Sequence, residues 1–320
     1  MKKKLNVLGT GFSGLDIIKN NNEDIYLPGG TCANVLSVLS SLGWESNLIK
    51  AKYQDDWNEY VESKLKELGV NIINYKNSRK NTPRVVQVTK NEKHHFFTTC
   101  PLCKRKLINL DLPLEKHLVN LERLFYNLDV LYYDRISYGI KALVTQAQNN
   151  NIWSVYEPNT GRSYKHLLDN ISEANIVKFS SERIFLSIAN KLKKDLVSID
   201  SHTKIIIITH GKKGITFSVR QQNALFSEWE EIEADNIENI IDTSGAGDWL
   251  TAGFINNFIK EYPKVTNDIN ASDVISALRS AQSLSKICCS SIGALGHFYK
   301  NIRSQASFTS VNQCTFCKSE

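Results

Sequence analysis

The sequence predicts an α/β fold, a three-layer α/β/α domain with a small β-sheet lid, from three observations. Short apolar strand-like runs alternate with longer helix-like runs along most of the chain, a pattern typical of a mostly parallel sheet covered on both faces. Residues 12–28 and about 83–98 have half-polar strand character with no intervening helix, which suits a small projecting sheet. The 320 residues, 42% apolar and 22% charged, suffice for one large domain and exclude a disordered or collagen-like chain.

The elements of the main domain follow from their periodicity. A first strand is expected at residues 4–8. Apolar spacing predicts a helix over 32–42 that ends at Gly43, and a second over 57–68 that ends at Gly69. Further strands are expected at 130–133, 152–156, 176–179, 205–209 and 215–219, and further helices at 116–125, 140–149, 182–192, 246–259 and 272–288.

Composition narrows the classes of partner and location. No apolar run approaches the length of a membrane span, so no membrane contact is expected. The basic start of the chain is followed by too short an apolar segment for a signal peptide, which favours a cytoplasmic protein. The net charge of +6 on so long a chain is only weak evidence for nucleic acid as a partner, because nucleic-acid binding needs clustered charge.

The clearest chemical signal is the sequence Asp-Thr-Ser-Gly-Ala-Gly-Asp at residues 242–248, which runs into an apolar helix. Small residues at a helix start expose backbone N–H groups, which together with the helix dipole form an anion-binding site. Gly245, Ala246 and Gly247 are the candidates for that site, and Asp248 is placed to accept a proton from a hydroxyl that attacks a bound phosphate. The alternative is a simple N-capping turn, but such a cap needs no triple of small residues.

This heptapeptide matches without a gap the C-terminal signature of the ribokinase-like (PfkB) carbohydrate kinases, Asp-Thr-(Thr/Ser)-Gly-Ala-Gly-Asp. The chain resembles that family in two further places. Gly-Gly-Thr-Cys-Ala-Asn at residues 29–34, followed by Leu42-Gly43, resembles the N-terminal signature. Thr-His-Gly-Lys-Lys-Gly at residues 209–214 resembles the nucleotide-contacting Thr-x-Gly-x-x-Gly segment. Their order and separation also fit, so the resemblance spans about residues 5–295.

The resemblance implies a kinase domain over residues 1–310, with a lid from about 12–30 and 83–110, and a short tail at 311–320. It implies transfer of the γ-phosphoryl group of ATP to a hydroxyl of a sugar or sugar-like polyol, with Mg²⁺ bridging the phosphates. Asp248 would be the general base, and ATP would lie against residues 209–214 and 290–294. The nucleotide-binding residues implied are Thr209, Gly211, Gly214 and Glu182, and the acceptor-binding residues are Asp16, Gly30, Asn34 and Arg162.

Two segments depart from the family's pattern. Glu157-Pro158-Asn159 followed by Arg162 resembles its Asp-x-Asn-x-Arg segment, with Glu in place of Asp and one extra residue before the arginine. In its Asn-x-x-Glu segment Glu182 fits the acidic position, but Phe179 stands where Asn is common, so altered metal handling is expected. A surface glutamate in the first turn of a helix is the alternative interpretation of Glu182.

Two alternatives are set beside the sugar kinase. A nucleoside could be the acceptor, since the same residues support transfer to a hydroxymethyl group. The chain could instead be a catalytically silent member that binds a sugar or nucleotide and acts through its cysteine-rich patch, although an intact Asp248 argues against this. Residues 9–14 also spell the dinucleotide-binding Gly-x-Gly-x-x-Gly, but no helix is expected after them and position 34 is Asn, so a Rossmann site is rejected.

Four of the seven cysteines form two Cys-x-x-Cys pairs, Cys100 with Cys103 and Cys314 with Cys317. Two such pairs can supply the ligands of a closed tetrahedral Zn²⁺ site, which would pin the tail near the lid. Separate surface thiols, a disulfide formed on purification, or redox pairs are the alternatives. The carbohydrate kinase family does not require this site. Apolar lid positions such as Phe96 or Phe97 could also pair two lids in a homodimer.

Overall fold

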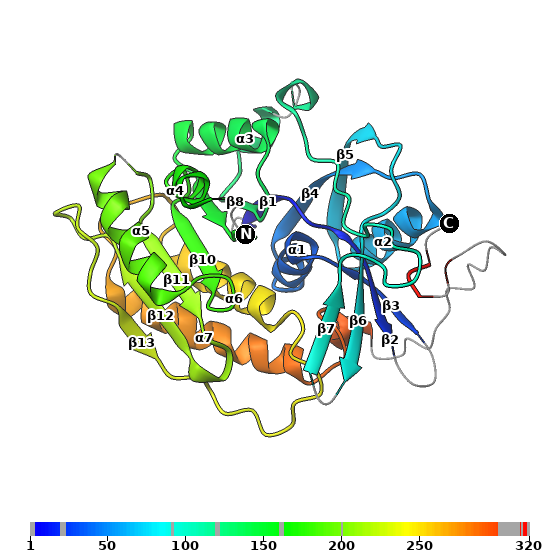
Figure 1. Cartoon of the computed structure of the whole chain (residues 1–320). Coiled ribbons are helices and arrows are strands. Elements are labelled where there is room, and N and C mark those ends of the chain that lie inside the picture. The colour runs from blue at the N-terminus through cyan, green and yellow to red at the C-terminus, as the bar shows by residue number, and fades with distance from the viewer. Residues whose placement is uncertain are drawn as a thin grey trace.

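The computed structural model describes residues 4–19, 24–90, 93–118, 122–159, 163–199, 201–299, 314 and 316–318. These residues form a large sheet covered by helices and a separate small sheet (Figure 1). The predicted α/β class and the additional small sheet are thereby confirmed. Within the described part of the chain, none of the helices combines the length and the apolar character that crossing a membrane requires.

The large sheet has the strand order β13-β12-β11-β10-β9-β8-β1-β4-β5. The pairings from β11 through to β5 are all parallel, and β12 and β13 add an antiparallel edge. The bounds are β1 (Asn6–Thr10), β4 (Glu45–Lys52), β5 (Val70–Asn77), β8 (Val130–Tyr133), β9 (Trp153–Tyr156), β10 (Ile176–Ser180), β11 (Ile205–Thr209), β12 (Ile215–Val219) and β13 (Glu230–Ile232).

Two hydrophobic cores lie on the two faces of this sheet, because successive strand residues point to opposite sides. Ile205 and Ile207 pack in one core, and Ile206 and Ile208 in the other. The first core is shared with α1 (Thr31–Ser41), α2 (Asp56–Glu67), α6 (Ala246–Glu261) and α7 (Ala271–Cys289). The second is shared with α3 (Tyr138–Asn149), α4 (Tyr164–Ile171) and α5 (Leu186–Ser198).

The small sheet has the order β3-β2-β6-β7 and lies beside α2 and the start of α1 in Figure 1. Its strands are β2 (Gly14–Lys19), β3 (Ile25–Gly29), β6 (Arg84–Lys90) and β7 (Lys93–Phe97). The strand pairings put Asp16, Gln87, His94 and Phe96 on one face, and Arg84 and Phe97 on the other.

Several sequence-based expectations were wrong in detail. The helix expected at 116–125 is replaced, in its described parts, by single 3₁₀ turns at Glu115–His117 and Glu122–Phe125, which bring Leu118 and Phe125 into the second core without a continuous helix. The helix expected at 182–192 begins only at Leu186, because residues 181–183 form a turn after β10. The patterns of β4, β5, β13 and α4 were not recognised.

The close contact of α6 with α7 depends on a glycine. A Cβ on Gly253 would lie 2.9 Å from Cα and 3.0 Å from Cβ of Ala281, so the two helix backbones approach more closely than a larger residue allows. We expect Gly253→Val to lower the free energy of unfolding by about 1–3 kcal/mol through overpacking. Urea unfolding measures the change.

The control for this substitution is Ser280→Val, on an exposed position of α7. It introduces the same β-branched side chain into a helix without crowding a neighbour, so a change within about 0.5 kcal/mol is expected. Equal effects of the two substitutions would contradict the argument from helix packing.

Candidate active site

The carboxyl ends of the parallel strands meet along one edge of the large sheet, the usual location of ligand sites in open α/β sheets. Asp134 follows β8 and Glu157 follows β9, while Thr209 ends β11. Glu182 lies on the turn after β10. Polar groups from four strands far apart in the sequence are therefore collected at this edge.

The turn at residues 242–248 forms the N-terminus of α6. Gly245 is its N-cap, with φ 82°, and a Cβ there would lie 2.3 Å from Cβ of Ala294. Only glycine combines this left-handed conformation with so close a contact. The backbone N–H of Ala246 donates to the Thr243 carbonyl at 3.2 Å, which closes the turn. The first-turn amides of a helix point toward its N-terminal end, so the backbone at 245–247 faces the space before α6.

The two sequence signatures, 214 residues apart, meet through one hydrogen bond. Asn34 Nδ2 on α1 donates to Oδ2 of Asp248 on α6 at 2.6 Å. Gly30 forms the start of α1 with φ 98°, where a Cβ would lie 2.6 Å from the Phe12 carbonyl oxygen. Asn34 is 4% exposed, and among the described residues its Oδ1 has no hydrogen-bond partner. A buried acceptor atom therefore stands next to the Asp248 carboxylate.

The charge state of Asp248 is set by its surroundings. Burial first, and the negative charge of Glu157 second, raise its pKa to about 7. Lys178, the hydrogen bond from Asn34 and the positive charge of Arg183 oppose this shift. A carboxyl group with a pKa near neutrality can accept a proton and release it again under ordinary conditions.

Beneath Asp248 a buried ion pair supports the helix start. Lys178 Nζ lies 2.8 Å from Oε1 of Glu157 and donates to the Gly247 carbonyl oxygen at 3.0 Å. Tyr132 and Thr251 donate their hydroxyls to the other oxygen of Glu157, at 3.3 and 3.1 Å. Lys178 was not recognised as a site residue, although a lysine inside an apolar strand was a usable signal.

Asp16 lies on the face of the small sheet that it shares with Gln87 and His94. Its carboxylate lies against Gly29 of β3, where a Cβ would be 2.0 Å from Oδ2. Burial first, and the charge of Asp242 second, raise the pKa of Asp16 to about 7. The residue retains some exposure, and the charge of Asp242 places its carboxylate near the turn before α6.

Asp242 joins the small sheet to the turn before α6. Its carboxylate accepts backbone N–H groups from Ser244 at 2.8 Å and from Gly293 at 2.9 Å. Gln87 Nε2 on β6 donates to it at 3.0 Å, and His94 Nε2 on β7 lies 3.2 Å away. Burial acts to raise the pKa of Asp242, but these backbone hydrogen bonds hold it below its ordinary value. Sequence reasoning placed neither Gln87 nor His94 at this site.

The residues implied for nucleotide binding lie at the neighbouring strands. Gly211, with φ 57°, and Gly214, with φ 97°, bracket a single 3₁₀ turn after β11. The backbone N–H of Ser181 donates to the Thr209 carbonyl at 2.9 Å, which links that strand to the turn carrying the exposed Glu182. The structure thus places Thr209, Gly211, Gly214 and Glu182 at the ends of β10 and β11, and their part in binding a nucleotide stays a prediction.

Arg162 lies outside the described residues. Phe179 is 3% exposed and packs in the second core, so its side chain has a packing role where many family members carry Asn. Residues 290–294 lie against the turn before α6 through the Gly293 contact with Asp242 and the contact between Gly245 and Ala294.

The chain matches the model of a known protein family. The model of the pfkB family carbohydrate kinases matches residues 16–297. The chain belongs to this family. Membership confirms the resemblance inferred from the three motifs and assigns the chain to the ATP-dependent carbohydrate kinases.

Individual relatives are distant in sequence. The chain is 26% identical over 289 residues to the ATP-dependent 6-phosphofructokinase of Thermoanaerobacterium thermosaccharolyticum, covering 81% of this chain and 83% of that protein. It is 23% identical over 283 residues to the probable fructokinase-5 of Arabidopsis thaliana, covering 84% of each. A nucleoside kinase of Methanocaldococcus jannaschii is 25% identical over 274 residues, covering 79% of this chain and 83% of that protein.

Solved structures confirm the fold. A fructokinase from Xylella fastidiosa with bound ATP superimposes with a TM-score of 0.74 at 17% identity, covering 91% of this chain and 94% of that one. A ribokinase from Giardia lamblia superimposes with a TM-score of 0.74 at 15% identity, covering 92% of this chain and 96% of that one. The ribokinase-like architecture is therefore shared.

The raised pKa of Asp16 predicts a pH-dependent stability. Because its folded pKa of about 7 exceeds the unfolded value of 3.8, the folded chain loses stability as pH rises through that window. We expect Asp16→Asn to raise the free energy of unfolding by about 1–3 kcal/mol at pH 8, and the gain to vanish near pH 4.

Urea unfolding at the two pH values measures this difference, with Glu45→Gln, at an exposed position of β4, as control. The control is expected to leave the unfolding free energy unchanged at both values. A gain for Asp16→Asn that is equal at pH 4 and pH 8 would contradict burial of an ionised carboxylate.

Proposed function

We propose that this pfkB family member transfers the γ-phosphoryl group of ATP to a hydroxyl of a sugar or sugar-like polyol. The observation that carries the proposal is the hydrogen bond from Asn34 to Asp248, which sets a carboxylate with a pKa near neutrality at the N-terminus of α6. An anion-binding helix start and a proton acceptor at one point are what transfer of phosphate to a hydroxyl needs.

Asp248 acts as the general base in this proposal. The attacking hydroxyl gives its proton to the carboxylate as the oxygen bonds to phosphorus and the bond to the leaving ADP oxygen breaks. The backbone of Gly245, Ala246 and Gly247 stabilises the transferring group. The hydrogen bond from Lys178 to the Gly247 carbonyl oxygen holds this backbone in place, so the anion site is formed before the phosphate binds.

The acceptor is held by directional polar groups. Asp16 and the unpartnered Oδ1 of Asn34 accept hydrogen bonds from sugar hydroxyls, and Gly30 allows the acceptor to approach the backbone closely. Arg162 is proposed as a further contact on the sequence match alone. A polyol satisfies several such groups at once, and this favours it over acceptors that have a single hydroxyl.

ATP is proposed to lie along the carboxyl ends of β10 and β11. The turns around Gly211 and Gly214 contact the nucleotide, with Thr209 beside them. Mg²⁺ supplies charge neutralisation on the phosphates when bound. The exposed carboxylate of Glu182 suits an ion that retains most of its waters, whereas Glu157 is already engaged by Lys178. Buried Phe179 offers no oxygen to the ion.

A nucleoside acceptor is the second candidate. The nucleoside kinase of Methanocaldococcus jannaschii matches this chain about as closely as the sugar kinases do. Exposed Phe96 lies on the same face of the small sheet as Asp16, and an aromatic ring there could stack on a base. A catalytically silent binding protein is the weaker alternative, because the ion pair and hydrogen bonds around Asp248 maintain a base at the phosphate site.

The cellular location and the oligomeric state of the protein stay predictions. A cytoplasmic location is proposed from the sequence. The homodimer through the small sheet would use the edge of β7, because Phe96 faces the acceptor side and Phe97 is covered by Phe316, with ring centroids 5.4 Å apart.

The test is ATP turnover with Mg²⁺ against a panel of hexoses, pentoses, sugar phosphates and nucleosides. We expect one sugar or polyol to support turnover. Asp248→Asn is expected to lower kcat by about 10²–10⁴-fold, because it removes the base and keeps the shape. Asp273→Asn, in the first turn of α7, is the matched control and is expected to retain activity.

Turnover with nucleosides alone would establish the second candidate in place of the first. A panel without turnover by a chain that still binds ATP would favour the silent member. Full activity of Asp248→Asn would exclude that residue as the base.

A further inference from the structure

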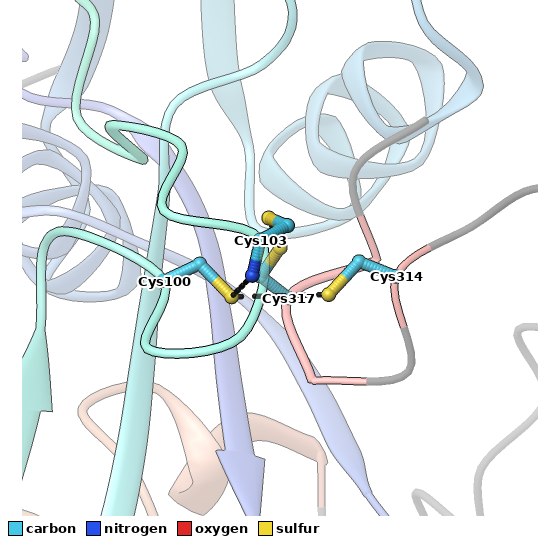
Figure 2. Close-up of side chains that lie close together, drawn as sticks. All are labelled: Cys100, Cys103, Cys314 and Cys317. Atoms are coloured by element: carbon cyan, nitrogen blue, oxygen red, sulfur yellow. Dashed lines mark hydrogen bonds between the residues drawn. The ribbon is translucent and has the colours of Figure 1, made fainter.

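The two Cys-x-x-Cys segments come together on the small sheet (Figure 2). One ligand atom from each of Cys100, Cys103, Cys314 and Cys317 lies within 4.8 Å of all the others. Sγ of Cys100 is 3.8 Å from that of Cys314, and Sγ of Cys103 is 3.6 Å from that of Cys317. Zinc–sulfur bonds of about 2.3 Å in a tetrahedron place sulfur atoms about 3.8 Å apart, whereas a disulfide needs about 2.05 Å.

Both segments have the same local backbone. Lys104 and Lys318, each directly after the second cysteine of its pair, have φ values of 60° and 55°. Each donates its backbone N–H to the carbonyl of the first cysteine, at 3.0 Å for Cys100 and 2.8 Å for Cys314. A left-handed conformation is unfavourable for lysine, so its occurrence at equivalent places indicates that the two turns serve the same function. Each turn directs its two thiols toward a common point.

Burial and charge around the cluster also suit a metal. Cys100 and Cys317 are 0% exposed, and none of the four cysteines forms a disulfide. Four thiolates around a divalent ion carry a net charge of −2, which is costly to bury without nearby cations. Four basic residues follow the cysteine pairs directly in the sequence, namely Lys104, Arg105, Lys106 and Lys318.

The cluster fastens the C-terminal segment to the outer face of the small sheet. Arg84 of β6 donates to the backbone carbonyls of Cys317 and Lys318, and it also pairs with Asp55. The Phe316 ring packs edge-on against Phe97 and lies 5.3 Å below Nζ of Lys19. The opposite face of the same sheet carries Asp16 and Gln87 of the candidate active site.

We infer that these four cysteines form a structural Zn²⁺ site that fixes the described residues around Cys314 and Cys317 to the back of the small sheet. The site holds no open coordination position for substrate, since four protein thiolates complete the tetrahedron. Its role is to hold the sheet that presents Asp16 and Gln87. The inference goes beyond the proposed kinase activity, and its measurements do not depend on that activity.

Metal content tests the site directly. The full chain purified without chelator is expected to contain about one zinc per molecule by elemental analysis. Replacement by Co²⁺ is expected to give the absorption of a tetrahedral tetrathiolate. The double variants Cys100→Ser with Cys103→Ser, and Cys314→Ser with Cys317→Ser, are each expected to contain none. Cys289→Ala removes a buried thiol outside the cluster and is expected to keep its zinc.

Should a double variant fail to fold, the single variant Cys103→Ser tests the site, because Cys103 is exposed and its side chain does not pack in a hydrophobic core. It is expected to lose zinc to a competing chelator at least about tenfold more readily than the wild type. Absence of zinc from the wild type, or zinc retained in both double variants, would overturn the inference. A wild-type mass lower by two hydrogens for each bridge, without metal, would assign disulfides instead.

Hydrogen exchange tests the fastening. Removal of the metal by a chelator is expected to speed amide exchange in β6 and β7, while β9 and β11 of the large sheet stay protected. Unchanged exchange in β6 and β7 after complete loss of zinc would show that the metal does not hold the small sheet.

Discussion

The site depends on one electrostatic constraint, a carboxylate held at the start of α6 in a place that water reaches poorly. Burial disfavours the charged form of Asp248, and the nearby charge of Glu157 disfavours it further. Lys178 offsets both by pairing with Glu157 and by holding the backbone of Gly247. Asn34 adds a hydrogen bond from α1. The parallel sheet is what lets residues so far apart in the sequence converge on this carboxylate.

The small sheet is tied to the same place from two sides. On its inner face Gln87 and His94 contact Asp242, the first residue of the turn that presents Asp248. On its outer face Phe316 and the paired cysteine segments cover it. Any change in the position of this sheet therefore acts on Asp16 and on the turn at residues 242–248 together. The C-terminal segment, remote in sequence, is in contact with the frame of the site.

Much of the fold and of the candidate site could be predicted from the sequence, because the signals come from residue types at neighbouring positions. The turn at 242–248 and the start of α1 need glycine at positive φ and close contact, so their residue types carry the information directly. The buried strands β8, β10 and β11 are short apolar runs with clear ends. The cysteine pairs are similarly explicit, since their spacing alone brings two thiols together.

Other features depend on contacts that spacing does not encode. In β4, Lys50 is buried against Glu62 and Asn58, so the strand looks polar although its side chains are buried. Lys178 and Gln87 acquire roles only when the fold brings Glu157 and Asp242 to them. Phe179 stands where Asn is common in the family, and its role in the second core follows only from the packing of the fold.

The pH dependence of phosphoryl transfer in a single turnover tests the central claim most directly, because it reports the ionisation of the base while ATP and acceptor are bound. We expect a rate that rises with pH and levels off above an apparent pKa near 7, and a slow, pH-independent rate for Asp248→Asn. A wild-type rate that is constant from about pH 5 to 9, or an Asp248→Asn variant with the wild-type profile, would contradict it.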